Sequence, residues 1–257
     1  MKPTNRGGPP KVALVTGGAR GIGRTCALHL AEKDFSIALV DVLVPEMERV
    51  RQEIELQGGR VICLEGDVAD HQRAKEIVSE VQAKLGRVDF LLNNAGRPMP
   101  KGILEITEAE FDRTIAINLK SCFNYIQPIV PLMRATGRGR IVCMSSLNAY
   151  SGGVTAAVSR FSYAAAKAGI LGMVRALAKE LGPEIHINAI CPGLIATEVG
   201  KNSVISARGA EIAENGIALK RLGCTDDVAQ LVGFLATSDP CFITGQAFVV
   251  DGFQFQV

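Results

Sequence analysis

The sequence predicts an α/β fold, in which a doubly wound sheet of parallel strands is flanked by helices on both faces. Runs of about six β-branched and apolar residues alternate with longer segments of helical periodicity, the order typical of parallel strands joined by right-handed crossovers. The strand runs are apolar throughout rather than alternating, as expected when helices cover both sides of a sheet. A glycine-rich turn separates the first strand from the first helix, which is a common arrangement in this class.

The elements follow one another without a linker, a repeat or a low-complexity tract. Each expected strand is a β-branched apolar run, and the expected helices are amphipathic or, late in the chain, rich in alanine. In chain order we expect a strand at 11–18, a helix at 21–34, a strand at 35–42, a helix at 45–57, a strand at 60–68, a helix at 71–85, a strand at 88–96, a helix near 108–133, a strand at 140–146, a helix around 162–181, and strands at 185–193 and 246–252.

This continuity predicts a single domain over residues 11–257. The opening segment MKPTNRGGPP, residues 1–10, has no apolar core like that of a signal peptide, so we expect a disordered tail. A chain of 257 residues is long for one domain but ordinary for an α/β fold.

Composition excludes several classes of function. Hydrophobic residues make up 47% of the chain and charged residues 21%, with a net charge of +2 from 28 basic and 26 acidic residues. No basic cluster stands out, so neither nucleic acid nor an anionic membrane is an expected partner, and no apolar stretch reaches the length of a membrane span.

The cysteines and histidines point to a reducing compartment and away from a metal site. The seven cysteines are scattered, form no CxxC pair and lie mostly in apolar runs, which favours free thiols in the cytoplasm. None of the three histidines is spaced with another His or Cys as metal ligands are, so no metal is expected.

The turn TGGARGIG, residues 16–23, is typical of a dinucleotide site. Gly17, Gly21 and Gly23 lie between a strand and a helix, where bare backbone lets a pyrophosphate approach the helix N-terminus. The alternative is a tight strand-to-helix turn that needs glycine only for its backbone conformation. The position between strand and helix favours the dinucleotide.

Asp41 predicts NAD rather than NADP. It ends the second strand, eighteen residues after Gly23 (41 − 23), and an acid near that offset typically binds the adenosine ribose hydroxyls. At about 5 Å and an effective dielectric of about 20, a carboxylate would repel a 2′-phosphate by on the order of 3 kcal/mol. Arg20 argues the other way, because a base beside the glycine turn could pair with that phosphate.

The segment FSYAAAKAG, residues 161–169, places Tyr163 and Lys167 four residues apart among alanines. Alanine favours a helix, and this spacing puts both side chains on one helix face. Taken alone, the pair could belong to an ordinary surface helix.

Taken in order, the motifs resemble those of the short-chain dehydrogenase/reductase family, and the resemblance covers Lys11 to Gly252. The matching pieces are TGGARGIG (16–23), GDV (66–68), NNAG (93–96), Asn118 within IAINL, SS (145–146), YAAAK (163–167), PGLIAT (192–197) and VVDG (249–252). The similarity is to members of the 3-oxoacyl-[acyl-carrier-protein] reductase type and to NAD-linked alcohol dehydrogenases. It implies a Rossmann-type, dinucleotide-binding catalytic domain.

The resemblance assigns catalysis to Asn118, Ser146, Tyr163 and Lys167. Tyr163 would be the acid/base, Lys167 would stabilise its phenolate and bind the nicotinamide ribose, and Ser146 would hold the substrate oxygen. Asn118 would position a water molecule for proton relay. The cofactor-binding residues expected from the turn, from Asp41 and from the resemblance are Gly17, Arg20, Gly21, Ile22, Gly23, Asp41, Asp67, Val68, Asn94, Ala95, Gly96, Tyr163, Lys167, Pro192, Gly193, Ile195 and Thr197.

Two segments differ from the common pattern or lie beside the expected substrate. Ser146 and Tyr163 are seventeen residues apart (163 − 146), several more than in many relatives. Asn148, Tyr150 and Val158 in this longer segment are candidates for substrate specificity, and Ser145 is the alternative to Ser146. Residues 198–219 are expected to form a mobile lid.

The leading hypothesis is an NAD(H)-dependent oxidoreductase for a ketone or secondary alcohol, acting as a homotetramer in the cytoplasm. The tetramer follows from the resemblance and from the apolar C-terminus QAFVVDGFQFQV. A second hypothesis is an NADPH-dependent 3-oxoacyl thioester reductase, which Arg20 allows and Asp41 opposes. A third, from another class, is a nucleotide-sensing scaffold without catalysis, which would be expected to lack Tyr163 or Lys167.

Overall fold

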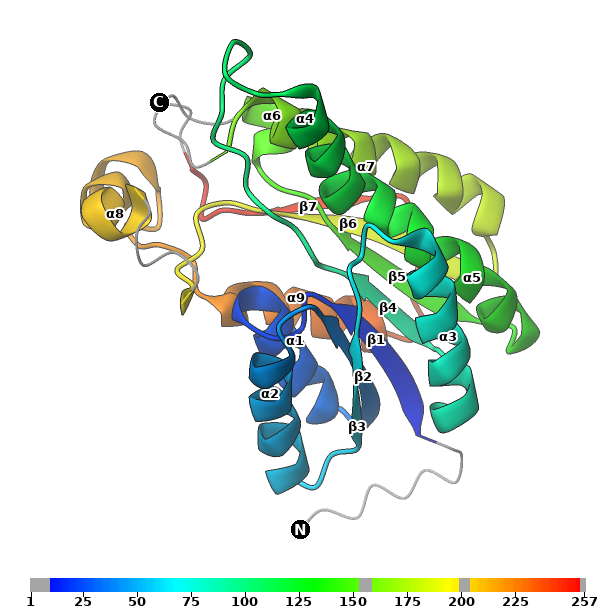
Figure 1. Ribbon diagram of the computed structural model, residues 1–257. Helices are drawn as coiled ribbons and strands as arrows, with labels where there is room; N and C mark the ends of the chain where they lie inside the picture. Colours follow the sequence, from blue (N-terminus) through cyan, green and yellow to red (C-terminus); the bar gives the residue numbers. More distant parts are fainter. Residues whose placement is uncertain (1–9, 153–158, 199–203, 255–257) are drawn as a thin grey trace.

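The computed structural model of the chain describes residues 10–152, 159–198 and 204–254. A seven-stranded, wholly parallel sheet in the order β3-β2-β1-β4-β5-β6-β7 forms the centre, with helices on both faces (Figure 1). This confirms the predicted fold class. Nearly all of the expected tail at 1–10 and one candidate specificity residue, Val158, lie outside the described residues.

The strands begin close to their predicted positions but end earlier. They are β1 Lys11–Thr16, β2 Phe35–Asp41, β3 Val61–Glu65, β4 Phe90–Asn93, β5 Gly139–Met144, β6 Ile185–Pro192 and β7 Ala247–Val250. The residues that follow several of these strands carry the recognised motifs. The chain leaves the sheet where a motif begins, so the motifs form loops along one edge rather than strand ends.

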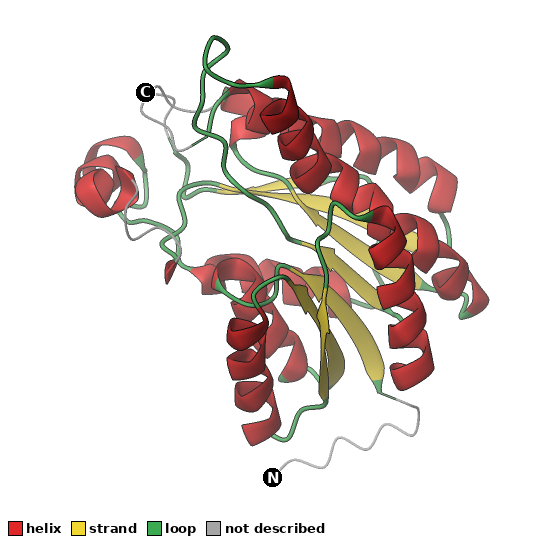
Figure 2. Cartoon of the chain, in the orientation of Figure 1, coloured by secondary structure: helices red, strands yellow, loops and turns green. Residues whose placement is uncertain are grey.

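Helices cover both faces of the sheet, although not every helix packs against it (Figure 2). They are α1 Gly21–Ala31, α2 Val44–Leu56, α3 His71–Leu85, α4 Glu108–Ile115, the π-helical turn η1 Ala116–Lys120, α5 Ser121–Ala135, α6 Asn148–Ser151, α7 Phe161–Leu181, α8 Val204–Gly216 and α9 Thr225–Thr237. Helices α3, α5 and α7 cover one face, and α1, α2 and α9 cover the other. Within the described residues, no helix is both long and apolar enough to cross a membrane.

Each strand contributes to two apolar cores. In β1, Val12 and Leu14 pack on one side of the sheet, and Ala13 and Val15 pack on the other. Because both faces are covered, side chains at both odd and even positions are mostly apolar, which explains the long apolar runs in the sequence. All seven cysteines are free thiols.

Four differences from the expected elements concern helices, and one of them is the short helix α6, which lies where no helix was expected. The predicted helix near 108–133 is interrupted by the π-helical turn at 116–120. Helix α9 was not predicted, although Val228, Val232 and Leu235 recur at helical spacing and are buried. The segment 198–219, expected as a lid, includes helix α8, and its mobility stays a prediction.

Candidate active site

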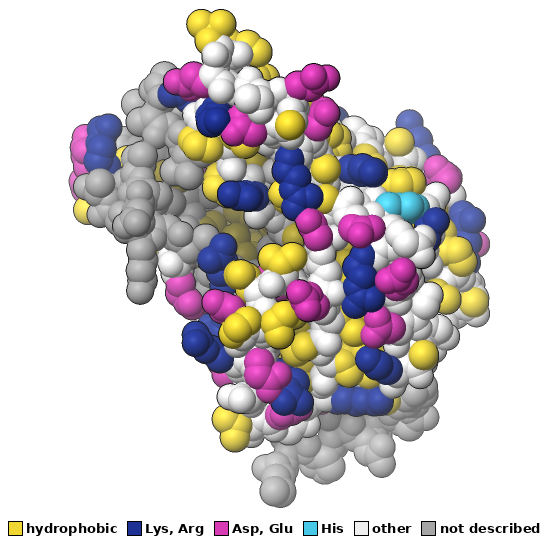
Figure 3. All heavy atoms as spheres, in the orientation of Figure 1, with side chains coloured by type: hydrophobic (Ala, Val, Ile, Leu, Met, Phe, Trp, Pro, Cys, Tyr) yellow, Lys and Arg dark blue, Asp and Glu magenta, His cyan; other side chains and the backbone are white. Residues whose placement is uncertain are grey.

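The strand order creates a crevice between β1 and β4 at the carboxyl edge of the sheet. From β1 the chain proceeds to β2 on one side, and from β4 it proceeds to β5 on the other side. Such a reversal leaves space between the loops that follow the two strands, which is where open α/β sheets bind ligands. A cleft of about 770 Å³ opens here, visible as a hollow with Lys and Arg side chains on its rim (Figure 3).

Nearly all of the predicted site residues line this single cleft. The cleft contains Gly17, Arg20, Gly21, Ile22, Asp41, Asp67, Val68, Asn94, Ala95, Gly96, Ser146, Tyr163, Lys167, Pro192, Gly193, Ile195 and Thr197. Gly23 and Asn118 do not line it and lie directly behind it. Lining residues that were not predicted include Val42, Leu43, Gly66, Arg97, Pro98, Arg113, Ile117, Met144 and Leu194. Most of these residues lie next to a recognised motif in the sequence, and this proximity could have identified them.

The glycine turn has no room for side chains. A Cβ on Gly17 would lie 2.8 Å from Ala95 Cα, and one on Gly23 would lie 2.0 Å from the carbonyl oxygen of Gly17. Gly17 and Gly21 also have positive φ angles of 66° and 55°, which other residues adopt only with strain. The turn thus forms a bare backbone cradle at the start of α1, and its shape fits the pyrophosphate of a dinucleotide.

A set of hydrogen bonds closes the inner end of the crevice. Thr16 Oγ1 accepts the N–H groups of Asn94 at 3.0 Å and Ala95 at 3.2 Å, and it donates to the carbonyl of Leu92. Asn94 Nδ2 donates back to the carbonyls of Thr16 and Gly17, both at 3.1 Å. This Thr16–Asn94 clamp fixes the loop after β4 against the glycine turn. Thr16 is the first residue of the TGGARGIG motif but was not predicted as a site residue.

Asp41 lies at the end of β2 with its carboxylate held by the backbone. One oxygen accepts the N–H of Ala19 at 3.1 Å, and the other accepts those of Val42 at 2.8 Å and Leu43 at 3.2 Å. The carboxylate is therefore fixed beside the glycine turn. Arg20, the residue predicted to oppose it, is exposed on the same cleft at the start of α1.

The loop after β3 presents Asp67 and Val68 to the cleft. Asp67 forms an ion pair of 2.5 Å with Arg113 of α4 and accepts the N–H of Ala69 at 3.0 Å. Partial burial would raise the pKa of Asp67, but the Ala69 N–H and the Arg113 guanidinium together hold that pKa below its usual value. This end of the cleft thus has its charges paired.

Helix α7 brings Tyr163 and Lys167 together, with Lys167 Nζ 5.6 Å from the centroid of the Tyr163 ring. Lys167 is only 3% exposed, and its ammonium donates to the carbonyl of Met144 at 2.7 Å. Ser145 is also buried, and its hydroxyl donates to the backbone carbonyl of Lys167 at 2.7 Å. Two reciprocal bonds therefore fasten the end of β5 to α7. An ammonium has three N–H donors, so two remain for the cleft.

Ser146 lines the cleft, and its Oγ accepts the N–H of Asn148 at 3.2 Å. Its hydroxyl proton has no acceptor among the described residues. The candidate specificity residues Asn148 and Tyr150 lie on α6 and are not among the residues lining the cleft.

Asn118 occupies the π-helical turn, where its side chain replaces helix hydrogen bonds. Asn118 Nδ2 donates to the carbonyls of Thr114 at 3.0 Å and Arg97 at 2.9 Å, while Oδ1 accepts the N–H of Arg97 at 3.0 Å. The amide thus has protein partners at both ends. A Cβ on Gly96 would lie 3.0 Å from Asn118 Oδ1 and 3.4 Å from Lys167 Nζ, so Asn118 lies beside the lysine. π-helical turns are frequent at functional sites.

The end of β6 and the loop after it form another part of the cleft wall. Pro192, Gly193, Ile195 and Thr197 all line the cleft. A Cβ on Gly193 would lie 2.6 Å from the Cβ of Asp251, so the loop packs closely against the segment after β7.

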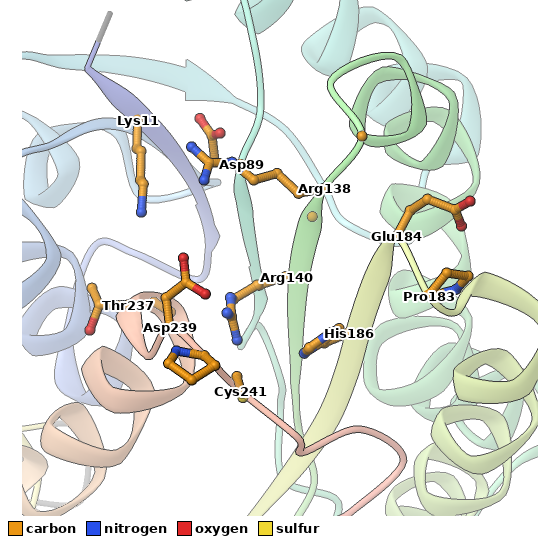
Figure 4. A pocket seen from close by; sticks show the side chains of 14 residues that line it. Lys11, Asp89, Arg138, Arg140, Pro183, Glu184, His186, Thr237, Asp239 and Cys241 are labelled. Carbon is orange, nitrogen blue, oxygen red and sulfur yellow. The ribbon is translucent and has the colours of Figure 1, made fainter. Parts of the chain in front are cut away.

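A second pocket of about 360 Å³ lies at the opposite edge of the sheet (Figure 4). Its charged lining residues are Lys11, Asp89, Arg138, Arg140, Glu184 and Asp239, so acids and bases are equal in number. Burial, aided by the Arg140 cation, lowers the pKa of His186 there and favours its neutral form. None of the predicted site residues lies in this pocket.

The fold and the carboxyl-edge cleft are those of a nucleotide-binding α/β protein, and comparison with known proteins specifies the class further. Residues 17–252 match the family model described as enoyl-(acyl carrier protein) reductase. The chain belongs to the short-chain dehydrogenase/reductase family, as its motifs predicted. It is accordingly an oxidoreductase that uses NAD or NADP to transfer a hydride to or from a small-molecule substrate.

Relatives in sequence and structure share this assignment. An uncharacterized short-chain type dehydrogenase/reductase of Sinorhizobium fredii is 36% identical over 246 residues, which cover 94% of this chain and 96% of that protein. A 3-oxoacyl-[acyl-carrier-protein] reductase of Thermotoga maritima is 36% identical over 243 residues, with the same coverage of 94% and 96%. A 7α-hydroxysteroid dehydrogenase complexed with NADH and 7-oxo glycochenodeoxycholic acid superposes with a TM-score of 0.90 at 30% identity, covering 97% of this chain and 96% of its own.

The glycine cradle generates the first prediction. Replacing Gly23 by Ala should weaken NADH binding at least tenfold, because the added methyl group would lie 2.0 Å from the Gly17 carbonyl and would force the turn to shift. Fluorescence titration with NADH measures the affinity, and circular dichroism establishes that the variant is folded. Gly172→Ala is the matched control, since a Cβ at that position in α7 meets no atom within 4 Å. Unchanged NADH affinity in Gly23→Ala would show that the turn does not hold the cofactor.

Proposed function

We propose that the protein is an NAD(H)-dependent dehydrogenase/reductase that interconverts a ketone and a secondary alcohol, with Tyr163 as the acid/base. The observation that carries this proposal is the pairing of Tyr163 with Lys167 in the same cleft as the glycine turn. A phenol and a buried ammonium beside a nucleotide cradle are suited to moving a proton while a hydride is transferred.

Each catalytic side chain has a distinct proposed task. The bound nicotinamide would supply the hydride to the carbonyl carbon, or accept it from the alcohol carbon in the reverse direction. Tyr163 donates its phenolic proton to the carbonyl oxygen during reduction and takes a proton from the alcohol during oxidation. Lys167 stabilises the phenolate with its positive charge, and its two remaining N–H donors are available to the nicotinamide ribose.

Ser146 is the better candidate for holding the substrate oxygen. Its hydroxyl proton is free to point into the cleft, whereas that of Ser145 is donated to the Lys167 carbonyl. For Asn118 we propose a positioning role: its amide supports the π-helical turn and holds the Arg97 backbone beside Lys167. Relay through a water molecule would then use main-chain groups of the turn, because both ends of the amide have protein partners.

The cofactor is proposed to lie along the cleft in the order given by its lining residues. Asp67 and Val68 would border the adenine, Asp41 its ribose, and Gly17, Arg20, Gly21 and Ile22 the diphosphate together with Asn94, Ala95 and Gly96. Pro192, Gly193, Ile195 and Thr197 would border the nicotinamide. Gly23 would act indirectly, by allowing the turn to close on itself.

Asp41 favours NAD over NADP. Its carboxylate accepts three backbone N–H groups, so it cannot turn away from a phosphate on the adenosine ribose. Repulsion between like charges at such a site is on the order of 3 kcal/mol.

A second candidate function is an NADPH-dependent 3-oxoacyl thioester reductase. Relatives that are 36% identical over nearly the whole chain bear that name, and Arg20 lines the cleft where it could pair with the extra phosphate. Asp41 opposes it. A non-catalytic scaffold is less well supported, because Tyr163 and Lys167 are both present and adjacent.

We further propose that residues 11–257 act as one catalytic domain in the cytoplasm and assemble as a homotetramer. Strand β7 is the edge strand of the sheet, and Val249 on it is 46% exposed. An unpaired edge with an exposed apolar residue favours association with another chain.

The acid/base role predicts the effect of removing one hydroxyl group. Tyr163→Phe should lower kcat by about two to four orders of magnitude, because no group would then deliver the proton, while NADH affinity changes only a few-fold. Tyr125→Phe is the matched control, since the buried Tyr125 hydroxyl has no hydrogen-bond partner among the residues that the structure describes. Steady-state rates on a panel of ketones and alcohols give the comparison. A Tyr163→Phe enzyme with normal kcat would refute the proposed mechanism.

Cofactor choice predicts a second comparison. The wild-type protein should bind NADH at least tenfold more tightly than NADPH, and Asp41→Asn should remove most of that preference because the charge is lost. Parallel fluorescence titrations with the two cofactors measure both ratios without any knowledge of the substrate. Tighter binding of NADPH to the wild-type protein would make Arg20 the determinant and would favour the 3-oxoacyl thioester reductase.

The assembly proposal predicts a solution mass near four times the chain mass of 27.3 kDa. Size-exclusion chromatography with light scattering measures this mass. Val249→Lys, which places a charge on the edge strand, should shift the population towards smaller species. A wild-type monomer would contradict the proposal.

A further inference from the structure

The charges that line the cleft are unevenly distributed along it. Among the described lining residues the acids are Asp41 and Asp67, and both lie on the β2 and β3 side of the crevice. Asp67 is paired with Arg113, and Asp41 is held by backbone N–H groups beside Arg20. The proposed adenosine end is therefore close to electrically balanced.

The catalytic end carries two cations, Lys167 and Arg97, and no acid among the lining residues that the structure describes. The nearby Asp251 lies behind Gly193, where its carboxylate accepts the N–H groups of Phe253 and Gln254. Lys167 has a task in the proposed chemistry, since it stabilises the Tyr163 phenolate. Arg97 has no task in this chemistry, because hydride transfer to a neutral ketone does not require its charge.

The backbone of Arg97 is fixed beside the catalytic groups. Both its N–H and its carbonyl are bonded to the Asn118 amide, at 3.0 Å and 2.9 Å. The preceding residue, Gly96, lies against Asn118 and Lys167, and the following residue, Pro98, also lines the cleft. The Arg97 side chain therefore extends from a fixed backbone next to the reacting centre. This lowers the entropic cost of ordering the side chain when it binds a ligand.

Several other arginines of this protein are neutralised by a neighbouring acid. Ion pairs with carboxylates are formed by Arg24, Arg51, Arg73, Arg87, Arg113, Arg208 and Arg221. In the second pocket, Arg138 and Arg140 share the lining with Asp89, Glu184 and Asp239 (Figure 4). Arg97 is exposed, and none of the described acids lies within ion-pair distance of it.

We propose that Arg97 binds an anionic group of the substrate, so that the ketone or alcohol is a keto acid or hydroxy acid whose carboxylate lies close to the reacting carbon. This rests on the proposed function, because it takes Tyr163 and Lys167 to be the catalytic end. A planar guanidinium pairs with a carboxylate through two parallel hydrogen bonds, which would orient the carbonyl towards Tyr163 as well as bind the substrate.

The test compares an acid with its neutral ester. In a Tyr163→Phe background, chosen because its turnover should be about two to four orders of magnitude slower, calorimetry measures binding of 4-oxopentanoate and of its ethyl ester to the NADH complex. The acid should bind at least about tenfold more tightly than the ester, as expected for a charge-assisted hydrogen bond. Adding Arg97→Gln should abolish this difference by weakening the acid alone, and Arg97→Lys should restore part of it. In the enzyme that retains Tyr163, kcat/KM for reduction of 3-oxobutanoate should exceed that for its ethyl ester by a similar factor.

Arg160→Gln is the matched control. Arg160 precedes α7 and donates its backbone N–H to the carbonyl of Met99, but it does not line the cleft. Its removal should change the acid-to-ester ratio less than about threefold. If Arg160→Gln lowered the acid-to-ester ratio as much as Arg97→Gln, the preference for the acid would come from the overall positive charge and not from contact with Arg97. That result would overturn the proposal.

Three further outcomes separate this inference from the proposed function. If the acid shows no preference over the ester, or no detectable binding, the inference fails while NADH binding and the Tyr163 mechanism stand. If Arg97→Gln instead weakens NADH itself, Arg97 serves the cofactor and the inference is wrong. Absence of NADH binding to the parent protein would refute the proposed function first.

Discussion

The Thr16–Asn94 clamp is the interaction on which the site depends. A parallel sheet whose connections reverse direction leaves a gap at its carboxyl edge, and nothing in that topology fixes the width of the gap. The clamp does so with a hydroxyl and an amide that bridge β1 and β4. Because Asn94 Nδ2 also bonds the Gly17 carbonyl, the clamp sets the shape of the glycine turn. The cradle and the catalytic loops are thereby positioned by the same few atoms.

The catalytic half of the cleft is braced in a comparable way. Lys167 donates to the Met144 carbonyl, and Ser145 donates to the Lys167 carbonyl, so β5 and α7 are held at one register. The ammonium is buried against this brace rather than free to move. The sheet and the helix together therefore fix the distance between Lys167 and Tyr163. An acid/base pair needs such a fixed distance if its geometry is to stay the same while ligands bind and leave.

The sequence predicted the architecture well because strand and helix patterns are local, and it predicted most of the cleft because the motifs follow the strands. It could not predict relations that need three-dimensional contacts. In the sequence Thr16 is only the last residue of a strand, and its hydrogen bond with Asn94 across the gap is visible only in the structure. For Asn118 the resemblance implied water positioning, which stays a prediction; the hydrogen bonds of its amide to the Thr114 and Arg97 carbonyls are visible only in the structure. Helix α9 was not predicted although its apolar residues recur at helical spacing, because it contains none of the recognised motifs.

The π-helical turn at 116–120 makes the length of this segment as important as its residues. A π-helical turn holds one residue more than an α-helical turn, so the extra residue is absorbed within this turn and α5 keeps its apolar face towards the sheet. In a regular α-helix, the same extra residue would rotate everything after it by ~100°. Tyr125, Ile129 and Met133, which are fully buried, would then leave the core. The conformation of the turn at 116–120 therefore decides which face of α5 is buried.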